Sequence, residues 1–305
     1  MTDTKHTPVL LAETLMYLNP YADGWYLDGT LGGGGHAEAV LRTSAPTGVV
    51  VGFDRDPQAL ARATARLASY GDRFHSYHAS FSDAAALWRA QGYPSPDGIL
   101  LDLGLSSDQL GDARRGFSFQ IDAPLDLRFD PSGGMSAAEL LARVTEVELT
   151  EILATYGELR APRQLARQIL ANQQRQPILR TGDLVAASGL KHPRRLAQLF
   201  QAIRIATNEE LEIVGRALPD LWELLAPGGR LVVLTFHSLE DRITKHFMKK
   251  LAMAGVAQLL TKKPLAGTTE EVTANPRARS AKLRVIEKNK EVRGDVSTKK
   301  FNSGR

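Results

Sequence analysis

The 305-residue sequence contains no cysteine. Disulfide bonds, thiolate metal sites and cysteine nucleophiles are therefore excluded. The sequence also lacks an apolar run long enough to cross a membrane and a signal-like N-terminus, so we expect a soluble cytoplasmic protein with no membrane partner. Its seven histidines are scattered along the chain without the spacing of metal ligands. The sequence accordingly predicts no metal site.

Glycine is concentrated in one short segment, YLDGTLGGGGH at residues 26–36. An apolar strand leads into this segment and a helix is expected to follow from about Ala37, so the glycines allow a sharp turn and a close approach to a ligand. The next expected strand, VVVGFD, ends at Asp54, about 20 residues further on, where a carboxylate can accept hydrogen bonds from two ribose hydroxyls. The two strand ends indicate a nucleoside-binding site, although a glycine cluster alone is also typical of a flexible loop.

The nucleoside pattern fits either a dinucleotide or S-adenosylmethionine. Asp28 precedes the glycines, and its charge would repel a pyrophosphate but suits a cationic sulfonium group. No Gly-Lys-Ser/Thr ending follows the glycines, which argues against a P-loop. We therefore favour S-adenosylmethionine and keep a nicotinamide-dependent dehydrogenase as the distant alternative.

Strands and helices alternate in the first half of the chain. Strands are expected in WYLDG, VVVGFD, FHSYHASF and DGILLDLG, with helices near 37–43, 57–69 and 82–90, and a further strand is expected within 228–238. This alternation predicts a parallel α/β sheet. About 120 residues without a clear strand lie between the fourth and fifth strands.

Most of this long interval is predicted to be helical. SAAELLARV and TEVELTEIL each begin with the Ser/Thr-x-x-Glu capping pattern, and further helices are expected from Pro162 and from near Pro193. We expect a sheet domain of residues 1–112 and 208–305, interrupted by a helical domain of residues 113–207. An insertion after the fourth strand would stand over the carboxyl edge of the sheet, where such folds bind ligands, and would select the substrate.

Two expected strand ends turn suddenly polar. The groups beyond the fourth strand are Asp102, Ser106, Ser107 and Gln109, and those beyond the fifth are His237, Ser238, Glu240 and Asp241. Polar groups that follow buried strands usually mark a site, although Ser106 or Ser238 could simply cap a helix. Because both groups follow neighbouring strands, we expect one shared site.

Basic residues are concentrated toward the C-terminus. Residues 242–305 hold 16 Lys/Arg against 5 Asp/Glu, whereas residues 1–241 hold 22 against 29. A basic segment can bind nucleic acid by neutralising phosphates, but it can also be a solvated tail. NPRARSAKLRV at 275–285 favours the first alternative, since an arginine cluster leads into an expected edge strand. Arg194, Arg195 and Arg204, with Phe200 between them, are expected to form a second basic and partly apolar surface.

Several longer motifs identify a family that the chain resembles. They are HTPVLLAE at 6–13, DGTLGGGGH at 28–36, DRDPQA at 54–59, ILLDLGLSSDQL at 99–110, RGFSF at 115–119, PLDLRFDP at 124–131, TYGE at 155–158, APGGRL at 226–231, FHSLEDR at 236–242 and NPRARSAKLR at 275–284. In these motifs the chain resembles the bacterial 16S ribosomal RNA cytosine-N4 methyltransferases, the RsmH (formerly MraW) family. The chain departs from the usual pattern at Gly33 and Leu105. The resemblance implies a Rossmann-like class I S-adenosylmethionine-dependent methyltransferase sheet with an inserted helical domain.

The resemblance also implies a set of site residues. Those expected to hold S-adenosylmethionine are Gly34, Gly35 and His36 in the loop, Asp54 at the ribose, Phe81 near the adenine, and Asp102 and Gln109 beyond the fourth strand. Asp102, Ser106 and Ser107 are candidates for holding the acceptor amine. His237, or an ordered water, is the candidate for taking the released proton.

The implied reaction is direct methyl transfer to the exocyclic amine of a cytidine in the decoding centre of 16S rRNA, within the small ribosomal subunit, leaving S-adenosyl-L-homocysteine. A chain without cysteine cannot supply the thiolate that methylation of the cytosine ring carbon would require. A DNA amine methyltransferase is the near alternative, but the expected Asn/Asp-Pro-Pro-aromatic loop is replaced by DLGLSS. A homodimer is compatible with the sequence, which does not decide the oligomeric state.

Overall fold

Seven strands form one sheet in the order β3-β2-β1-β4-β5-β7-β6. The computed structural model describes residues 8–290, apart from the side chains of residues 107 and 108. The strands are β1 (Trp25–Asp28), β2 (Val49–Asp54), β3 (Phe74–His78), β4 (Gly98–Asp102), β5 (Arg230–Thr235), β6 (Ala257–Leu259) and β7 (Lys282–Lys288). The four strands expected in the first half of the chain are thus confirmed.

The first five strands are parallel, and β7 is antiparallel to both β5 and β6. A dinucleotide-binding sheet has the order 3-2-1-4-5-6 without such a strand. The antiparallel β7, inserted between β5 and β6, sets this sheet apart and agrees with the expected class I methyltransferase fold. The strand expected after the arginine cluster is β7, which begins at Lys282 after the short 3-10 helix η2 (Pro276–Arg279). The expectation of an edge strand is wrong, because β6 pairs with the outer side of β7.

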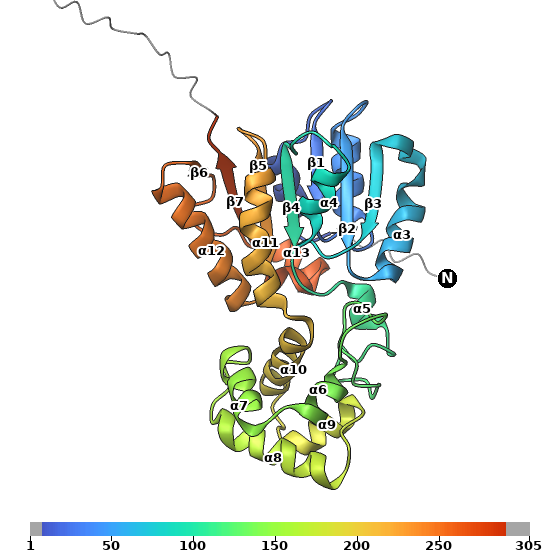
Figure 1. Ribbon diagram of the computed structural model, residues 1–305, viewed down its shortest axis with the longest axis vertical. Coiled ribbons are helices and arrows are strands. Elements are labelled where there is room, and N and C mark those ends of the chain that lie inside the picture. Colours follow the sequence, from blue (N-terminus) through green and yellow to red (C-terminus); the bar gives the residue numbers. More distant parts are fainter. Residues whose placement is uncertain (1–7, 291–305) are drawn as a thin grey trace, which may run out of the picture.

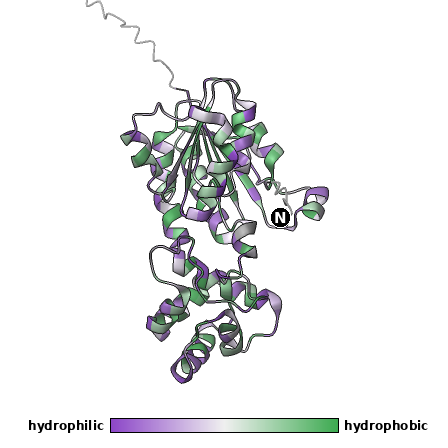
Figure 2. Ribbon diagram, turned by 90° about the vertical axis from the view of Figure 1, so that its right-hand side faces the viewer, coloured by the Kyte–Doolittle hydropathy of each residue, from purple (hydrophilic) through white to green (hydrophobic). Residues whose placement is uncertain are grey.

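Helices cover both faces of the sheet, as the side view shows (Figure 2). One face packs against α4 (Ala84–Ala90), α11 (Glu210–Leu224) and α12 (Ser238–Met253). The other face packs against α1 (Leu11–Leu18), α2 (Gly35–Thr43), α3 (Pro57–Leu67) and η2. Helix α13 (Thr269–Ala274) comes directly before η2 in the chain. Strands buried on both faces explain the continuous apolar runs in β2, β4 and β5. No helix in the described part of the chain is long and apolar enough to span a membrane.

A second lobe lies beyond the lower ends of the parallel strands (Figure 1). It consists of α6 (Ala137–Arg143), α7 (Glu146–Thr155), α8 (Pro162–Arg175), α9 (Thr181–Ser188) and α10 (Pro193–Asn208), and the short α5 (Ser107–Gly111) leads from β4 toward it. These helices share their own hydrophobic cluster. Both expected capping boxes are present, Ser136 with Glu139 and Thr145 with Glu148. The helical lobe stands at the carboxyl edge of the sheet, and the domain boundaries at 113 and 207 stay a prediction.

The expected surface of Arg194, Arg195, Arg204 and Phe200 is wrong in part. Arg194 and Arg195 are exposed at the start of α10. Phe200 is only 5% exposed because it packs in the helical core, and the Arg204 guanidinium is buried in an ion pair with Glu210. Helix α10 therefore presents its basic face only at its N-terminal end.

Candidate active site at the carboxyl edge of the sheet

A cavity opens where the parallel strands end, between the glycine loop and the helical lobe. Its lining comes from the loop after β1, the ends of β2 and β4, and helices α11 and α12, and it includes Gly32, Gly35, His36, Asp54, Phe81, Asp102, Ser106, Gln109, Glu210, Glu240 and Arg277. The positions expected to hold the cofactor are thus brought together, except that Gly34 lies behind the wall. Gly34 has a φ of +76° and faces Ala63, so its role is to turn the backbone.

Asp54 organises the glycine loop as well as one wall of the cavity. Its Oδ2 accepts a hydrogen bond from Gly32 N at 2.7 Å, and its Oδ1 accepts one from Asp56 N at 2.8 Å. Burial raises the pKa of the Asp54 carboxyl, and the two backbone donors oppose that shift. The carboxylate that sequence analysis places at the ribose therefore also holds the loop in shape.

The buried His36 and the half-buried Asp102 lie side by side in the wall of the cavity. His36 Nε2 lies 3.6 Å from Asp102 Oδ2. Burial lowers the pKa of His36 to about 4, so its imidazole is neutral at pH 7. Burial raises the pKa of Asp102 to about 7, although the charge of Arg277 acts against the shift. Asp102 Oδ1 is buried and has no hydrogen-bond partner in the described part of the chain, which leaves it available to a ligand.

Asp28 does not itself line the cavity but lies directly behind the glycine loop. It is only 3% exposed, and its Oδ1 accepts a hydrogen bond from Thr30 N at 3.1 Å. Burial raises the pKa of Asp28 to about 7, and the nearby charges of Asp102 and Asp54 add to the shift. Asp28 can therefore act on a bound cation through its field rather than by direct contact.

Ser106 and Gln109 cap each other at the start of α5. Gln109 Oε1 accepts from Ser106 N at 2.9 Å, and Ser106 Oγ accepts from Gln109 N at 3.1 Å. The alternative that Ser106 caps a helix thus holds, and Ser106 also lines the cavity. Phe81 lines the same cavity beside Gly29, where a Cβ would stand 2.9 Å from Phe81 Cβ. The side chain of Ser107 lies outside the described residues.

His237 caps α12 and is not among the described residues that line the cavity. Its Nε2 lies 3.1 Å from Glu240 Oε1, and Glu240 does line the cavity. Although burial alone would raise the pKa of Glu240, the hydrogen bond with His237 and the charge of Arg204 hold it below its ordinary value. His237 can therefore reach the cavity only through Glu240, which sequence analysis noted but did not assign a role.

Glu210, His237 and Glu240 each bring a potential metal-ligand atom within 4.8 Å of the others. Both carboxylate oxygens of Glu210 already accept from Arg204, at 2.7 and 2.8 Å. A guanidinium in this position balances much of the negative charge that would attract a cation. The absence of a metal site stays a prediction.

Asp241 and Ser238, which were grouped with His237 in the sequence, point elsewhere. Asp241 Oδ1 accepts from Arg284 Nε at 2.6 Å and so ties α12 to β7, while Ser238 Oγ donates to Glu158 at 3.2 Å in the helical lobe. Of the polar residues that follow β5, Ser238 and Asp241 therefore make structural contacts, whereas Glu240 lines the cavity.

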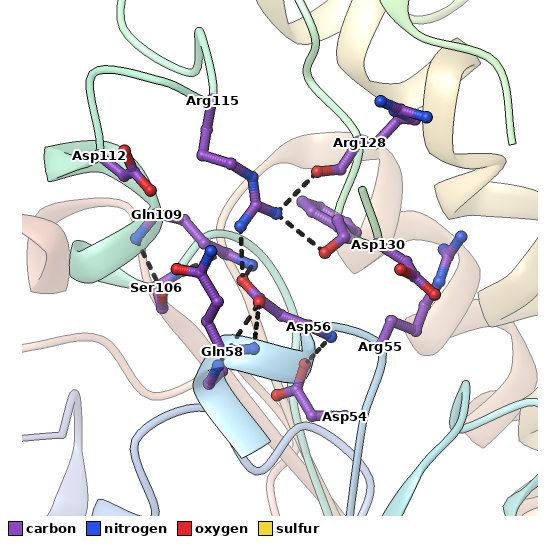
Figure 3. A network of polar contacts seen from close by, with 12 residues as sticks. Asp54, Arg55, Asp56, Gln58, Ser106, Gln109, Asp112, Arg115, Arg128 and Asp130 are labelled. Atoms are coloured by element: carbon purple, nitrogen blue, oxygen red, sulfur yellow. Dashed lines mark hydrogen bonds and ion pairs between the residues drawn. The ribbon is translucent and has the colours of Figure 1, made fainter. Parts of the chain in front are cut away.

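Sequence analysis did not predict the roles of two arginines, of which Arg277 lines the cavity and Arg115 contacts Asp56 outside the cavity lining. Arg115 is 5% exposed and donates to Asp56 Oδ2 at 3.1 Å and to the carbonyl of Phe129 at 2.9 Å (Figure 3). Gln109 Nε2 donates to the same Asp56 oxygen at 3.0 Å. Arg277, from η2, lines the cavity and donates to the carbonyl of Leu105. The only sequence signals for them were the motifs RGFSF and NPRARS.

Comparison with known proteins shows which family the chain matches. The model of the MraW methylase family matches residues 3–289. A ribosomal RNA small subunit methyltransferase H of Thermomicrobium roseum is 45% identical over 306 residues, covering 93% of this chain and 94% of its own. The protein of the same name from Heliobacterium modesticaldum is 44% identical, covering 93% and 98%. A solved rRNA methylase structure from Streptococcus thermophilus has 12% identity, a TM-score of 0.41, and coverage of 92% and 93%.

Proposed function

The chain belongs to the MraW methylase family, and from this premise we propose that it methylates the exocyclic N4 amine of a cytidine in the decoding centre of 16S rRNA. The observation that carries the proposal is the single cavity that joins the glycine loop and Asp54 to Asp102 and Glu240. One end suits a nucleoside, and the other offers carboxylates to an amine. We place the reaction in the cytoplasm, on the small ribosomal subunit.

S-adenosylmethionine is the methyl donor, and the described residues fit it. Asp54 would hold the ribose hydroxyls, the Phe81 ring would lie against the adenine, and Gly35 and His36 would border the methionine part. When bound, the donor supplies a methyl group on a cationic sulfonium, which the carboxylates of Asp28 and Asp102 would favour. Asp102 Oδ1 has no hydrogen-bond partner among the described residues, which supports a ligand at this point.

The acceptor amine needs positioning because its lone pair is delocalised into the cytosine ring. Asp102, with Ser106 and Ser107, would accept its N–H groups and turn the nitrogen toward the methyl carbon. Such positioning can contribute several kcal/mol to catalysis, up to about 7–11. The released proton would pass to water or through Glu240 to His237, which lie 3.1 Å apart. No covalent enzyme intermediate is involved.

Ribosomal RNA is the proposed partner. The names of the relatives support a small-subunit RNA substrate. The target cytidine must be unstacked to enter the cavity, at a cost of about a few kcal/mol. The helical lobe stands over the cavity, and its exposed arginines, with the basic C-terminal segment, would hold the flanking RNA by its phosphates.

Labelled methyl transfer tests this proposal. The purified protein would be given labelled S-adenosylmethionine with small ribosomal subunits, protein-free 16S rRNA or double-stranded DNA. We expect label on ribosomal RNA and none on DNA. Label on DNA would support the near alternative. Calorimetry that finds tight binding of NADH and none of S-adenosylmethionine would refute the proposal in favour of a dehydrogenase.

A further inference from the structure

Arg277 comes from the C-terminal part of the chain, lines the cavity and contacts the loop that follows β4. Its Nη2 donates to the carbonyl of Leu105, 172 residues earlier in the sequence. Leu105 belongs to the segment between β4 and α5, which carries Asp102 at one end and Ser106 at the other. Arg277 is therefore fastened to the segment that we propose to hold the acceptor amine.

Phe236 completes this contact from a third direction. The Arg277 guanidinium lies over the Phe236 ring, 5.7 Å from its centroid. The same ring packs on Gly104, where an added Cβ would meet it at 3.0 Å and where φ is +111°. The backbone at Gly104 thus lies against Phe236, and Arg277 covers that ring. Three distant segments of the chain, around residues 104, 236 and 277, meet here.

The charge of Arg277 also affects the pKa of Asp102. The titratable and charged groups around Asp102 come from six elements: Asp28 of β1, His36 of α2, Asp54 of β2, Glu210 of α11, Glu240 of α12 and Arg277 of η2. Most are acidic, and His36 is neutral at pH 7. Arg277 is the cation that lowers the pKa of Asp102 against burial and against the charge of Glu240.

We propose that Arg277 is a positioning residue that fixes the Asp102–Ser106 segment, which would receive the acceptor amine. This inference rests on the proposed function. The positioning role proposed for Arg277 differs from the role proposed for the basic C-terminal segment as a whole, which is to bind RNA phosphates. Arg279, two residues further in the same η2 helix, is exposed and carries the same charge, so it offers a matched control.

The test compares Arg277→Gln, Arg277→Lys and Arg279→Gln in the full chain. Methyl transfer to small ribosomal subunits would be measured from pH 5.5 to 9, with calorimetric affinity for S-adenosylmethionine and a thermal melt for each variant. For Arg277→Gln we expect kcat to fall by about 100-fold, as for a misplaced reacting group. The acidic limb of its pH profile should move up by about one unit, because Asp102 loses its neighbouring cation.

The other two variants separate charge from geometry. Arg277→Lys keeps the charge but loses the planar stack on Phe236, so the acidic limb should stay in place while kcat is intermediate. Arg279→Gln changes a residue of the basic segment proposed to hold the RNA, so it should raise KM for the subunit while kcat and the pH profile stay unchanged. If Arg277→Gln does not fold, the lysine variant still tests the inference. A lysine variant with the kcat of the wild type and an unshifted acidic limb in its pH profile would overturn it.

Two distinct outcomes separate this inference from the proposed function. If wild-type protein transfers no methyl group to ribosomal RNA, the proposed function fails. If wild-type protein is active and Arg277→Gln matches Arg279→Gln in kcat and pH profile, only the inference about Arg277 is overturned.

Discussion

Asp54 connects the shape of the glycine loop with the proposed contact to the cofactor. Its two oxygens accept from Gly32 N and Asp56 N, so the loop geometry depends on the same side chain that would hold the ribose. Sequence analysis placed Asp54 at the ribose from its position at a strand end, but it did not foresee the bond to Gly32. A residue with two such tasks should be sensitive even to small changes.

Replacement of Asp54 tests this directly. Asp54→Ala removes the carboxylate proposed to accept two hydrogen bonds from the ribose, and it removes the anchor of Gly32. We therefore expect the affinity for S-adenosylmethionine to fall about 100-fold or more. Calorimetry on the purified variant measures this. Asp72→Ala, the same change at an exposed aspartate, should leave the affinity unaltered. Equal affinities for the two variants would contradict the role of Asp54.

The raised pKa values of Asp28 and Asp102, each about 7, predict a pH-dependent preference between donor and product. Both carboxyls lose their protons as pH rises from 6 to 8, and the ionised forms attract the sulfonium of S-adenosylmethionine. S-adenosylhomocysteine lacks that charge. We therefore expect donor affinity to rise with pH relative to product affinity, by up to about 10-fold. Paired titrations at pH 6 and 8 measure the ratio, and a ratio that stays constant would rule out this electrostatic account.

At the scale of elements, the joint between the sheet and the helical lobe depends on Asp56. Asp56 caps α3 by accepting from Gln58 N at 2.9 Å, and it also accepts from Arg115 and Gln109 (Figure 3). Arg115 in turn donates to the carbonyls of residues 128 and 129, which lead toward the helical lobe. One buried carboxylate thus links the end of β2 to the segment that follows α5.

Asp56→Ala should therefore destabilise the protein strongly. It leaves the Arg115 guanidinium buried without its carboxylate, and we expect the free energy of unfolding to fall by about 3–5 kcal/mol. Asp112→Ala removes the partner of Arg114, which is 78% exposed, and should lower the free energy of unfolding far less than Asp56→Ala does. Urea denaturation of the two variants compares them. A similar loss in both would mean that the buried pair does not hold the joint.

The elements with local signals were predictable, and those that depend on distant partners were not. The capping boxes of α6 and α7 and the apolar strands β2 and β4 follow from neighbouring residues, and the structure confirms them. The partner of Arg115 lies 59 residues away and that of Arg277 lies 172 away, so no local pattern shows either contact. Likewise, the ion pair that buries Arg204 with Glu210 depends on how α10 meets α11.

At the scale of the whole molecule, the cavity proposed to bind the methyl donor lies apart from the surface proposed to bind RNA. Helix α10 spans Pro193–Asn208, so its exposed N-terminal arginines lie about 20 Å from its C-terminal end, which leads into α11 and the cavity-lining Glu210. Under the proposed function, the exposed Arg194 and Arg195 would contact RNA phosphates beyond the target cytidine.

The double variant Arg194→Gln/Arg195→Gln should weaken RNA binding at every salt concentration. We expect the slope of log affinity against log salt to become shallower by about one to two units, since two phosphate contacts are lost. Affinity for S-adenosylmethionine should not change. Filter binding over a salt series measures the slope, and an unaltered slope would show that the RNA does not reach this end of α10.

The identity of the methylated nucleoside tests the central claim most directly. Small subunits lacking the modification would be treated with the protein and S-adenosylmethionine, and the 16S rRNA would be digested and analysed by mass spectrometry against nucleoside standards. We predict N4-methylcytidine, located in the fragment that contains the decoding centre. Methylation at a ring carbon, on a ribose, or in another region of the RNA would contradict the account.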